Sequence, residues 1–232
     1  MKFTSKLLAT GALALGALAP IASANAQVDG RLATSSVSRA LLDTNAMQAA
    51  LTTIPTTYSA QLQSLEASQT QLNDLLRPFD ANGDGRIDDN EVGALDAAPN
   101  LANIRALQTE IAGIEEQLTA AQVYAVEQLL VQYNVALEQV ATQQQIVVVL
   151  DPTSLQYVAD GGDITSQVTT TLDTLVPQVG IVPPQGWRPQ PQSLQVFQEV
   201  QRRLLLRQAI ARQAAQQEQQ AEQPAQQAPS GR

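Results

Sequence analysis

Apolar residues recur at steps of three and four in two long stretches of the chain, with Gln69 filling one position of the first, a spacing that predicts coiled-coil helices. The first stretch has its apolar positions at Leu51, Ile54, Tyr58, Leu62, Leu65, Leu72 and Leu76. The second has them at Leu101, Ile104, Leu107, Ile111, Ile114, Leu118, Ala121 and Ala125, and then, after a slip in register, at Leu129, Tyr133, Ala136 and Val140. At about 1.5 Å per residue, each helix would be about 60 Å long. Because the break between them is short, we predict an antiparallel helical hairpin over residues 38–146 that turns near residues 80 to 100.

Pro55 interrupts the first apolar stripe. Proline lacks the backbone N–H and clashes with the preceding helical turn. It therefore predicts either a kink in the first helix or the point where its regular part begins.

Short apolar runs flank the hairpin and predict a small β portion over residues 146–159. Ile146 to Leu150 is a β-branched run that Asp151 and Pro152 break, and Leu155 to Ala159 reads as a second short strand. Leu32 to Val37 predicts one more strand before the hairpin. A helix over residues 164–176 follows, with its apolar face at Ile164, Val168, Leu172 and Leu175 and a cap from Asp163 or Thr165.

These elements predict an α+β protein in which the hairpin forms an arm on a small β body. Two or three strands and one helix are too few to bury a sizeable core. We therefore expect several copies of the chain to pool their strands, so that the body is completed by oligomerisation.

The composition changes after residue 176, and residues 177–232 form a tail rich in proline and glutamine. Its two ends are expected to be disordered. Between them, residues 193–215 predict a helix with Val196, Val200, Leu204 and Ala211 facing Arg203, Arg207 and Arg212. That helix is either a solvated tail helix or a basic amphipathic helix that contacts anionic lipid or a partner.

The N-terminus predicts export. Lys2 and Lys6 precede an apolar run, and Ala24-Asn25-Ala26 supplies a small-x-small cleavage site, so residues 1–26 are expected to be a signal peptide. Cleavage would lower the basic count from 13 to 11 against 22 acidic residues, giving a net charge of −11. Nucleic acid is therefore not an expected partner. The chain has no cysteine and no histidine, which removes the usual nucleophiles and bases, so no enzymatic activity is expected.

One stretch carries site chemistry, the sequence FDANGDGRIDDNEV at residues 79–92. It meets every position of the twelve-residue EF-hand loop, in which alternating oxygen ligands surround Ca²⁺. The predicted ligands over residues 80–91 are Asp80, Asn82, Asp84, the carbonyl of Arg86, Asp88 and the bidentate Glu91. The alternative is an acidic turn that joins two helices. Because only one such loop is present, we expect weak binding, with Kd of about 10⁻⁴ to 10⁻³ M.

The order of elements resembles the Skp/OmpH family of periplasmic chaperones. The resemblance covers residues 28–179 and rests on SRAL at residues 38–41, on Val149-Leu150-Asp151-Pro152, on Tyr157 and on Asp163-Ile164-Thr165. It implies a homotrimer whose strands form a small β body and whose hairpin arms surround a cavity that holds unfolded outer-membrane β-barrel proteins without nucleotide. It implies no catalytic residue.

Two departures from this family pattern stand out: the mature chain has no lysine and is acidic, which weakens the expectation of membrane contact, and the calcium-type loop and the tail are additions. We expect a periplasmic holdase, with client-binding residues Tyr58, Leu62, Leu65, Ile111 and Ile114 on the arms. Residues at heptad spacing also form the hairpin's own seam. The alternative function is a calcium-binding structural or buffering protein of the periplasm, in which the hairpin is a spacer.

Overall fold

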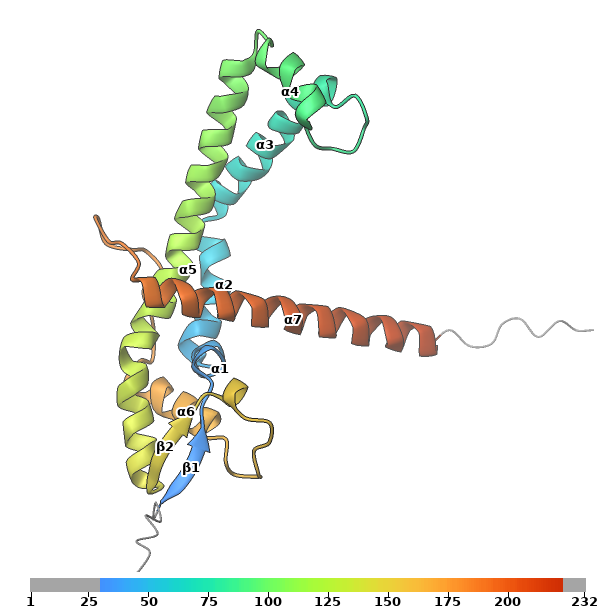
Figure 1. Cartoon of the computed structure of the whole chain (residues 1–232). Helices are drawn as coiled ribbons and strands as arrows, with labels where there is room; N and C mark the ends of the chain where they lie inside the picture. Colours follow the sequence, from blue (N-terminus) through green and yellow to red (C-terminus); the bar gives the residue numbers. More distant parts are fainter. Residues whose placement is uncertain (1–29, 223–232) are drawn as a thin grey trace, which may run out of the picture.

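The structure, a computed structural model, describes residues 30–222 and the side chains of residues 30–218. A long helical hairpin rises from a small body that contains two short strands, and the last helix crosses the lower part of the hairpin and projects to one side (Figure 1). The predicted α+β class and hairpin arm are confirmed. The predicted signal peptide lies outside the described residues.

The outgoing side of the hairpin consists of three consecutive helices. They are α1 (Val37–Leu42), α2 (Asn45–Thr57) and α3 (Ser59–Leu76). The hydroxyls of Ser36 and Thr44 start α1 and α2 by accepting hydrogen bonds from backbone N–H groups of the first turn. Pro55 lies inside α2, and the helix breaks at Tyr58. The interruption predicted from Pro55 is therefore a break between α2 and α3, close to the proline.

The returning side of the hairpin is the single helix α5 (Leu101–Gln143), and a compact turn connects the two sides. The turn contains the 3₁₀ helix η1 (Arg77–Phe79) and the short helix α4 (Asp89–Asp96). With 43 residues, α5 is about 65 Å long. α3 packs along its outer half, and α2 and α6 along its inner half.

The sheet is parallel because the whole hairpin lies between its strands. β1 (Arg31–Thr34) pairs with β2 (Ile146–Leu150), and the strand predicted over Ile146 to Leu150 is confirmed. Gln145 has a positive φ of 54°, and this left-handed conformation reverses the chain at the end of α5. β2 can therefore start beside the strand from which the hairpin departed.

Two strand predictions are wrong in part or in full. The first strand ends at Thr34 instead of Val37, because Ser36 already caps α1. Residues 155–159 form no strand; they belong to an irregular loop after the 3₁₀ helix η2 (Pro152–Ser154). The second edge of β1 is not open to them, since Thr34 pairs there with Asp163.

The core lies where α1, α2, α5, α6 (Thr165–Leu175) and the start of α7 (Pro191–Glu222) meet. Its fully buried side chains include Leu41, Leu42, Met47, Val126, Leu129, Ile164, Val168, Leu172 and Val200. The predicted apolar face of α6 is thus buried at three of its four positions, while Leu175 is exposed.

The segment after α6 is ordered, and the prediction of disorder for residues 177–190 is wrong. Gln128 binds both backbone groups of Gly180 at 2.9 Å, and the Tyr58 hydroxyl donates to the carbonyl of Ile181 at 3.1 Å. Trp187 stacks edge-on against Tyr124, with the ring centroids 5.3 Å apart. The segment therefore lies against α5 as a strap that leads into α7.

α7 is longer than the predicted helix over residues 193–215, and its two halves differ. Val196, Val200 and Leu204 pack into the core as their spacing predicted, whereas Ala211 is exposed. Arg203 donates to Ser38 and Ser36 at 2.7 and 3.0 Å. The first half of α7 is therefore part of the body, and the second half projects from it (Figure 1).

Candidate functional site

The arm is the first candidate site, and its inner and outer parts are packed differently. Near the body, Tyr58 is only 5% exposed and packs with Ile54, Ala121 and Ile181. Its hydroxyl is also bonded to the strap. Tyr58 is therefore already buried within the chain and offers little surface to a client, and its client-binding role stays a prediction.

Farther out, the other four nominated residues remain half-buried: Leu62 and Leu65 on α3, Ile111 and Ile114 on α5. Two helices alone cannot enclose the apolar seam between them, and among residues 30–222 no further element packs over it. The structure thus brings these four residues to one seam but leaves part of each exposed. A polar contact closes the seam nearby, where the Ser68 hydroxyl donates to Glu110 at 3.1 Å.

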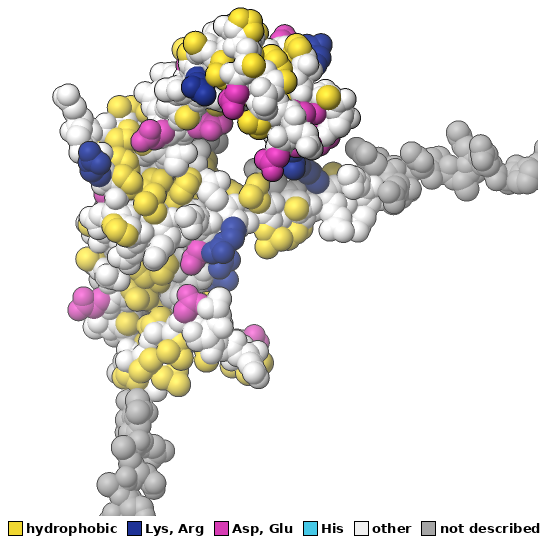
Figure 2. Space-filling model, turned by 45° about the horizontal axis from the view of Figure 1, so that its top comes forward, with side chains coloured by type: hydrophobic (Ala, Val, Ile, Leu, Met, Phe, Trp, Pro, Cys, Tyr) yellow, Lys and Arg dark blue, Asp and Glu magenta, His cyan; other side chains and the backbone are white. Residues whose placement is uncertain are grey.

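The outer arm is acidic. Its acidic residues are Glu66, Asp74, Asp80, Asp84, Asp88, Asp89, Glu91, Asp96, Glu110, Glu115 and Glu116, and its basic residues are Arg77, Arg86 and Arg105. Hydrophobic and charged side chains are interspersed over the tip (Figure 2). A partner of the arm therefore meets apolar surface surrounded mainly by carboxylates.

The loop at the tip is the second candidate site. Asp80 accepts three backbone N–H groups, from Gly83 and Asp84 at one oxygen and from Gly85 at the other, at 2.8 to 3.1 Å. Gly83 and Gly85 have φ values of +74° and +78°, which only glycine adopts without strain. The glycines thus let the chain wrap tightly around the Asp80 carboxylate.

Glu91 closes the loop from the opposite side. One of its oxygens accepts the N–H groups of Ala81 and Asn82 at 2.7 and 3.2 Å, and the other accepts that of Asp88 at 3.1 Å. Asp88 in turn caps α4, so the two residues form a capping box. Glu91 is 7% exposed, and these backbone donors satisfy its buried charge.

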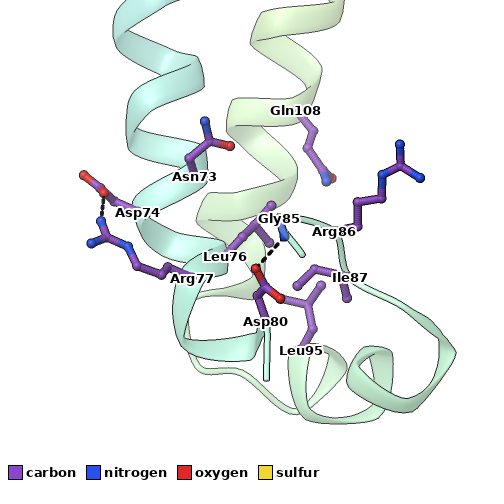
Figure 3. A pocket seen from close by; sticks show the side chains of 10 residues that line it. All are labelled: Asn73, Asp74, Leu76, Arg77, Asp80, Gly85, Arg86, Ile87, Leu95 and Gln108. Atoms are coloured by element: carbon purple, nitrogen blue, oxygen red, sulfur yellow. Dashed lines mark hydrogen bonds and ion pairs between the residues drawn. The ribbon is translucent and has the colours of Figure 1, made fainter. Parts of the chain in front are cut away.

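A cavity of about 510 Å³ lies beside this loop, between the end of α3, α4 and α5. Leu76, Ile87 and Leu95 give it an apolar side, while Asp80 points toward the backbone of Gly85 (Figure 3). Arg77, paired with Asp74, and Arg86 lie at its edge. Ile87, which the loop pattern predicts to pack inward, is half-buried in this cavity.

In this structure the carboxylates of the loop accept hydrogen bonds from backbone N–H groups of the same loop. Within residues 30–222, no three acidic side chains are grouped closely enough to hold a metal ion. Calcium binding would require Glu91 to give up its three backbone donors for the cation. The six predicted ligand residues lie in one turn, and calcium at this turn stays a prediction.

The open sheet is the third feature with functional meaning. Within the described residues, β2 pairs with β1 alone. Leu32, Val147 and Val148 are 61%, 51% and 39% exposed. Apolar side chains on a short sheet with an unpaired edge are a surface for pairing with another chain.

The sequence pattern did not reveal the residues that fix the strap to α5. Glu127 accepts hydrogen bonds from the Trp187 indole and the Gln190 N–H, both at 3.1 Å. Burial raises the pKa of Glu127, but hydrogen bonds from Gln190, Ser193 and Trp187 outweigh burial and hold it below its ordinary value. A glutamate and a glutamine at adjacent positions of a helix carry no signal by themselves; only the fold shows their partners.

The sequence profile of the family described as "Outer membrane protein (OmpH-like)" matches residues 31–172. The chain belongs to the OmpH-like family. The match begins at β1, includes the whole arm and ends in α6, so the strap and α7 lie outside it. The family membership predicted from SRAL and the residues around Asp151 and Asp163 is confirmed.

The OmpH-like chain is also similar to a solved structure from Caulobacter crescentus CB15, provisionally described as an OmpH-like outer membrane chaperone. The two are 22% identical, with a TM-score of 0.46, over 67% of this chain and 91% of that one. At these values the likeness adds nothing to the family match. The chain matches no curated protein.

Membership of the OmpH-like family supports a general chaperone role without enzymatic activity. Within residues 30–222, no helix combines the length and the hydrophobicity that a bilayer crossing requires.

Proposed function

We propose that this chain is an ATP-independent periplasmic holdase that binds unfolded outer-membrane β-barrel proteins and prevents their aggregation. The family match over residues 31–172 carries the proposal, since it covers β1, the arm, β2 and most of α6 as one unit. The predicted signal peptide supports the periplasmic location.

The half-buried seam of the outer arm is the proposed client surface. Leu62, Leu65, Ile111 and Ile114 keep part of their apolar area exposed, and an unfolded barrel protein presents apolar strand faces that aggregate in water. Many weak contacts along an arm hold such a chain through avidity and still release it. The acidic surroundings favour short-range apolar contacts over attraction to acidic clients.

The working form is proposed to be a homotrimer. The exposed residues of the short sheet, Leu32, Val147 and Val148, supply a surface for strands of other copies, which would extend the two-stranded sheet and cover these apolar side chains. Three arms would then surround one cavity.

The test is an aggregation assay with the mature protein. A urea-unfolded β-barrel protein diluted into buffer without nucleotide should stay soluble in a complex of defined stoichiometry. Leu62→Gln with Ile111→Gln should weaken holding about thirtyfold, since each half-buried side chain contributes about 1 kcal/mol and about 1.4 kcal/mol is a factor of ten. Gln63→Ala with Ala112→Gln, on exposed positions of the same helices, is the matched control. Failure of the unmodified protein at excess would contradict the holdase and favour the spacer function.

We also propose that residues 80–91 bind Ca²⁺ weakly. The complete loop motif supports this, together with the positive φ of Gly85 at the turn. Calcium would stiffen the tip of the arm. Calorimetric titration should give a Kd of about 10⁻⁴ to 10⁻³ M, and Glu91→Gln should abolish the heat. Equal absence of heat in both proteins would leave the acidic turn as the correct interpretation.

A further inference from the structure

The second half of α7 projects from the body with little packed against it (Figure 1). Every side chain from residue 205 to 218 is exposed. At its base Arg207 still pairs with Asp43 at 2.6 Å, and Leu206 lines a pocket beside Asp151 and Pro152. At about 1.5 Å per residue, residues 205–222 extend about 27 Å from the body. An isolated helix of this length is marginal in water, so a neighbour that covers it would stabilise it.

The exposed surface of this half is apolar and basic. Leu205, Leu206 and Ile210 are 63%, 60% and 57% exposed, and hydrophobic side chains are visible along the projecting helix (Figure 2). Arg202, Leu206 and Ile210 are spaced by four and share one face. Within residues 30–218, Arg202 makes no ion pair. No acidic residue occurs between residues 202 and 212.

α5 carries a face of matching size and opposite charge. Val131 and Val135, also spaced by four, are 61% and 43% exposed. The exposed Glu138 follows three residues later on the same face. Beside Val131 a pocket of about 210 Å³, lined also by Glu127, Leu130 and Asn134, offers room for one more side chain.

The two faces cannot meet within one chain. The first half of α7 is packed against α5 and α1 through buried residues such as Val200. The second half then points away from α5 (Figure 1). The α5 face of a second copy therefore has the apolar and acidic side chains that would complement the projecting half of α7.

We propose that the projecting half of α7 in each copy docks on the Val131–Val135 face of α5 in another copy. Leu206 and Ile210 would cover the two valines, and Arg202 would face Glu138. The contact joins two different surfaces, so it can be made reciprocally by two copies or repeated from copy to copy around a ring. The inference rests on the proposed self-association but not on the holding of clients, and it uses a segment outside the family match.

The absence of cysteine makes disulfide trapping a direct test. Ile210→Cys and Val135→Cys are purified separately, mixed at equal concentration and oxidised. The proposal expects a disulfide-linked dimer that contains one chain of each variant. The control is Val182→Cys, because Val182 is more exposed than Val135, at 64% against 43%, but lies on the strap. Equal trapping of Ile210→Cys by Val182→Cys, or no trapped product, overturns the proposal.

Charge exchange tests the polar part of the contact. Adding Arg202→Glu to the Ile210→Cys chain should slow trapping about fivefold, the effect of losing a good exposed ion pair. Adding Glu138→Arg to the Val135→Cys chain should restore the rate. Slowing without recovery would place the partner of Arg202 elsewhere and contradict the proposed alignment.

A second measurement separates loss of docking from loss of folding. Leu206→Gln with Ile210→Gln should raise the dissociation constant of the oligomer about tenfold or more, while the fluorescence of Trp187, which lies on the strap, stays unchanged. An unchanged dissociation constant overturns the proposal. Leucine-dependent binding to phosphatidylglycerol vesicles without trapping would do so as well and assign α7 to lipid. Intact holding of clients in any of these cases would leave the proposed function standing.

Discussion

Arg203 provides the sharpest test of whether α7 belongs to the body of the protein. Its guanidinium donates to the hydroxyls of Ser38 and Ser36 at 2.7 and 3.0 Å, and these serines are 1% and 4% exposed. It therefore joins the end of the chain to the start of the first helix. We expect Arg203→Ala to lower the free energy of unfolding substantially.

The magnitude follows from the two bonds. A hydrogen bond to a charged group contributes about 1.5 to 3 kcal/mol, but Arg203 is only half-buried, so water compensates part of the loss. We expect a cost of about 2 to 3 kcal/mol. The adjacent Arg202 is exposed and makes no hydrogen bond to the described residues; at a protein concentration low enough to keep the copies apart, Arg202→Ala should cost less than about 0.5 kcal/mol.

Arg207 gives an intermediate case. It pairs with Asp43 at 2.6 Å, with 47% and 38% of the two side chains exposed, and such pairs contribute at most about 1 kcal/mol. Urea unfolding of all three alanine variants at one protein concentration, followed by circular dichroism and by the fluorescence of the single tryptophan, Trp187, measures the order. Equal costs for Arg202→Ala and Arg203→Ala would refute the docking of α7.

Three further predictions concern the body. The pKa values of Glu127 and Asp163 lie below their ordinary values of 4.5 and 3.8, because hydrogen bonds outweigh the effect of burial; the folded state thus binds these protons less readily than the unfolded one. The stability that these two carboxylates contribute is complete above their ordinary pKa values and is lost as the pH falls through their folded pKa values. The urea midpoint, measured from pH 7 downward, should therefore depend less on pH in Glu127→Gln and in Asp163→Asn than in the unmodified protein. Tyr133 donates to the buried Ser35 hydroxyl at 2.7 Å, so Tyr133→Phe should cost about 1 to 2 kcal/mol in the same urea assay; no cost would contradict this bond. Gln145 has a φ of 54°, so Gln145→Gly should stabilise the fold by about 0.5 to 1 kcal/mol, and a loss of stability would show that its side chain matters more than its strain.

The heptad spacing was enough to predict the arm, because two helices joined by a short turn have one way to bury their stripes. Ile104 and Leu107, both predicted seam positions, are buried as expected. The spacing did not show how far along the arm other parts of the chain bury the apolar stripe. Tyr58 and Leu62 occupy equivalent positions in the pattern, yet the strap buries only Tyr58, and its contact with Ile181 joins residues 123 positions apart.

The local sequence pattern gave the wrong prediction where contacts with distant residues determine the structure. Residues 155–159 have the alternation of a strand, but the edge they would need is occupied by Asp163. Residues 177–190 have the composition of a disordered linker, yet Gln128, Glu127 and Tyr124 on α5 bind them. In the loop, the motif predicted the ligand residues, but not that Glu91 would be held by backbone N–H groups.

The strap and α7 determine which part of the OmpH-like arm is exposed. They bury the inner part of the seam, tie α5 to the break at Tyr58 and leave the outer seam as the exposed apolar surface of the arm. The proposed client surface is therefore confined to the outer half of the hairpin. This predicts that contacts with a client, mapped by photocrosslinking, lie beyond Tyr58.

The mass of the mature protein, measured by light scattering alone and after mixing with a urea-unfolded β-barrel protein in the absence of nucleotide, tests the central claim most directly. We expect three times the mass of one chain for the protein alone and a soluble complex of that trimer with the client. A monomer that leaves the client to aggregate would contradict both the shared β body and the holdase function.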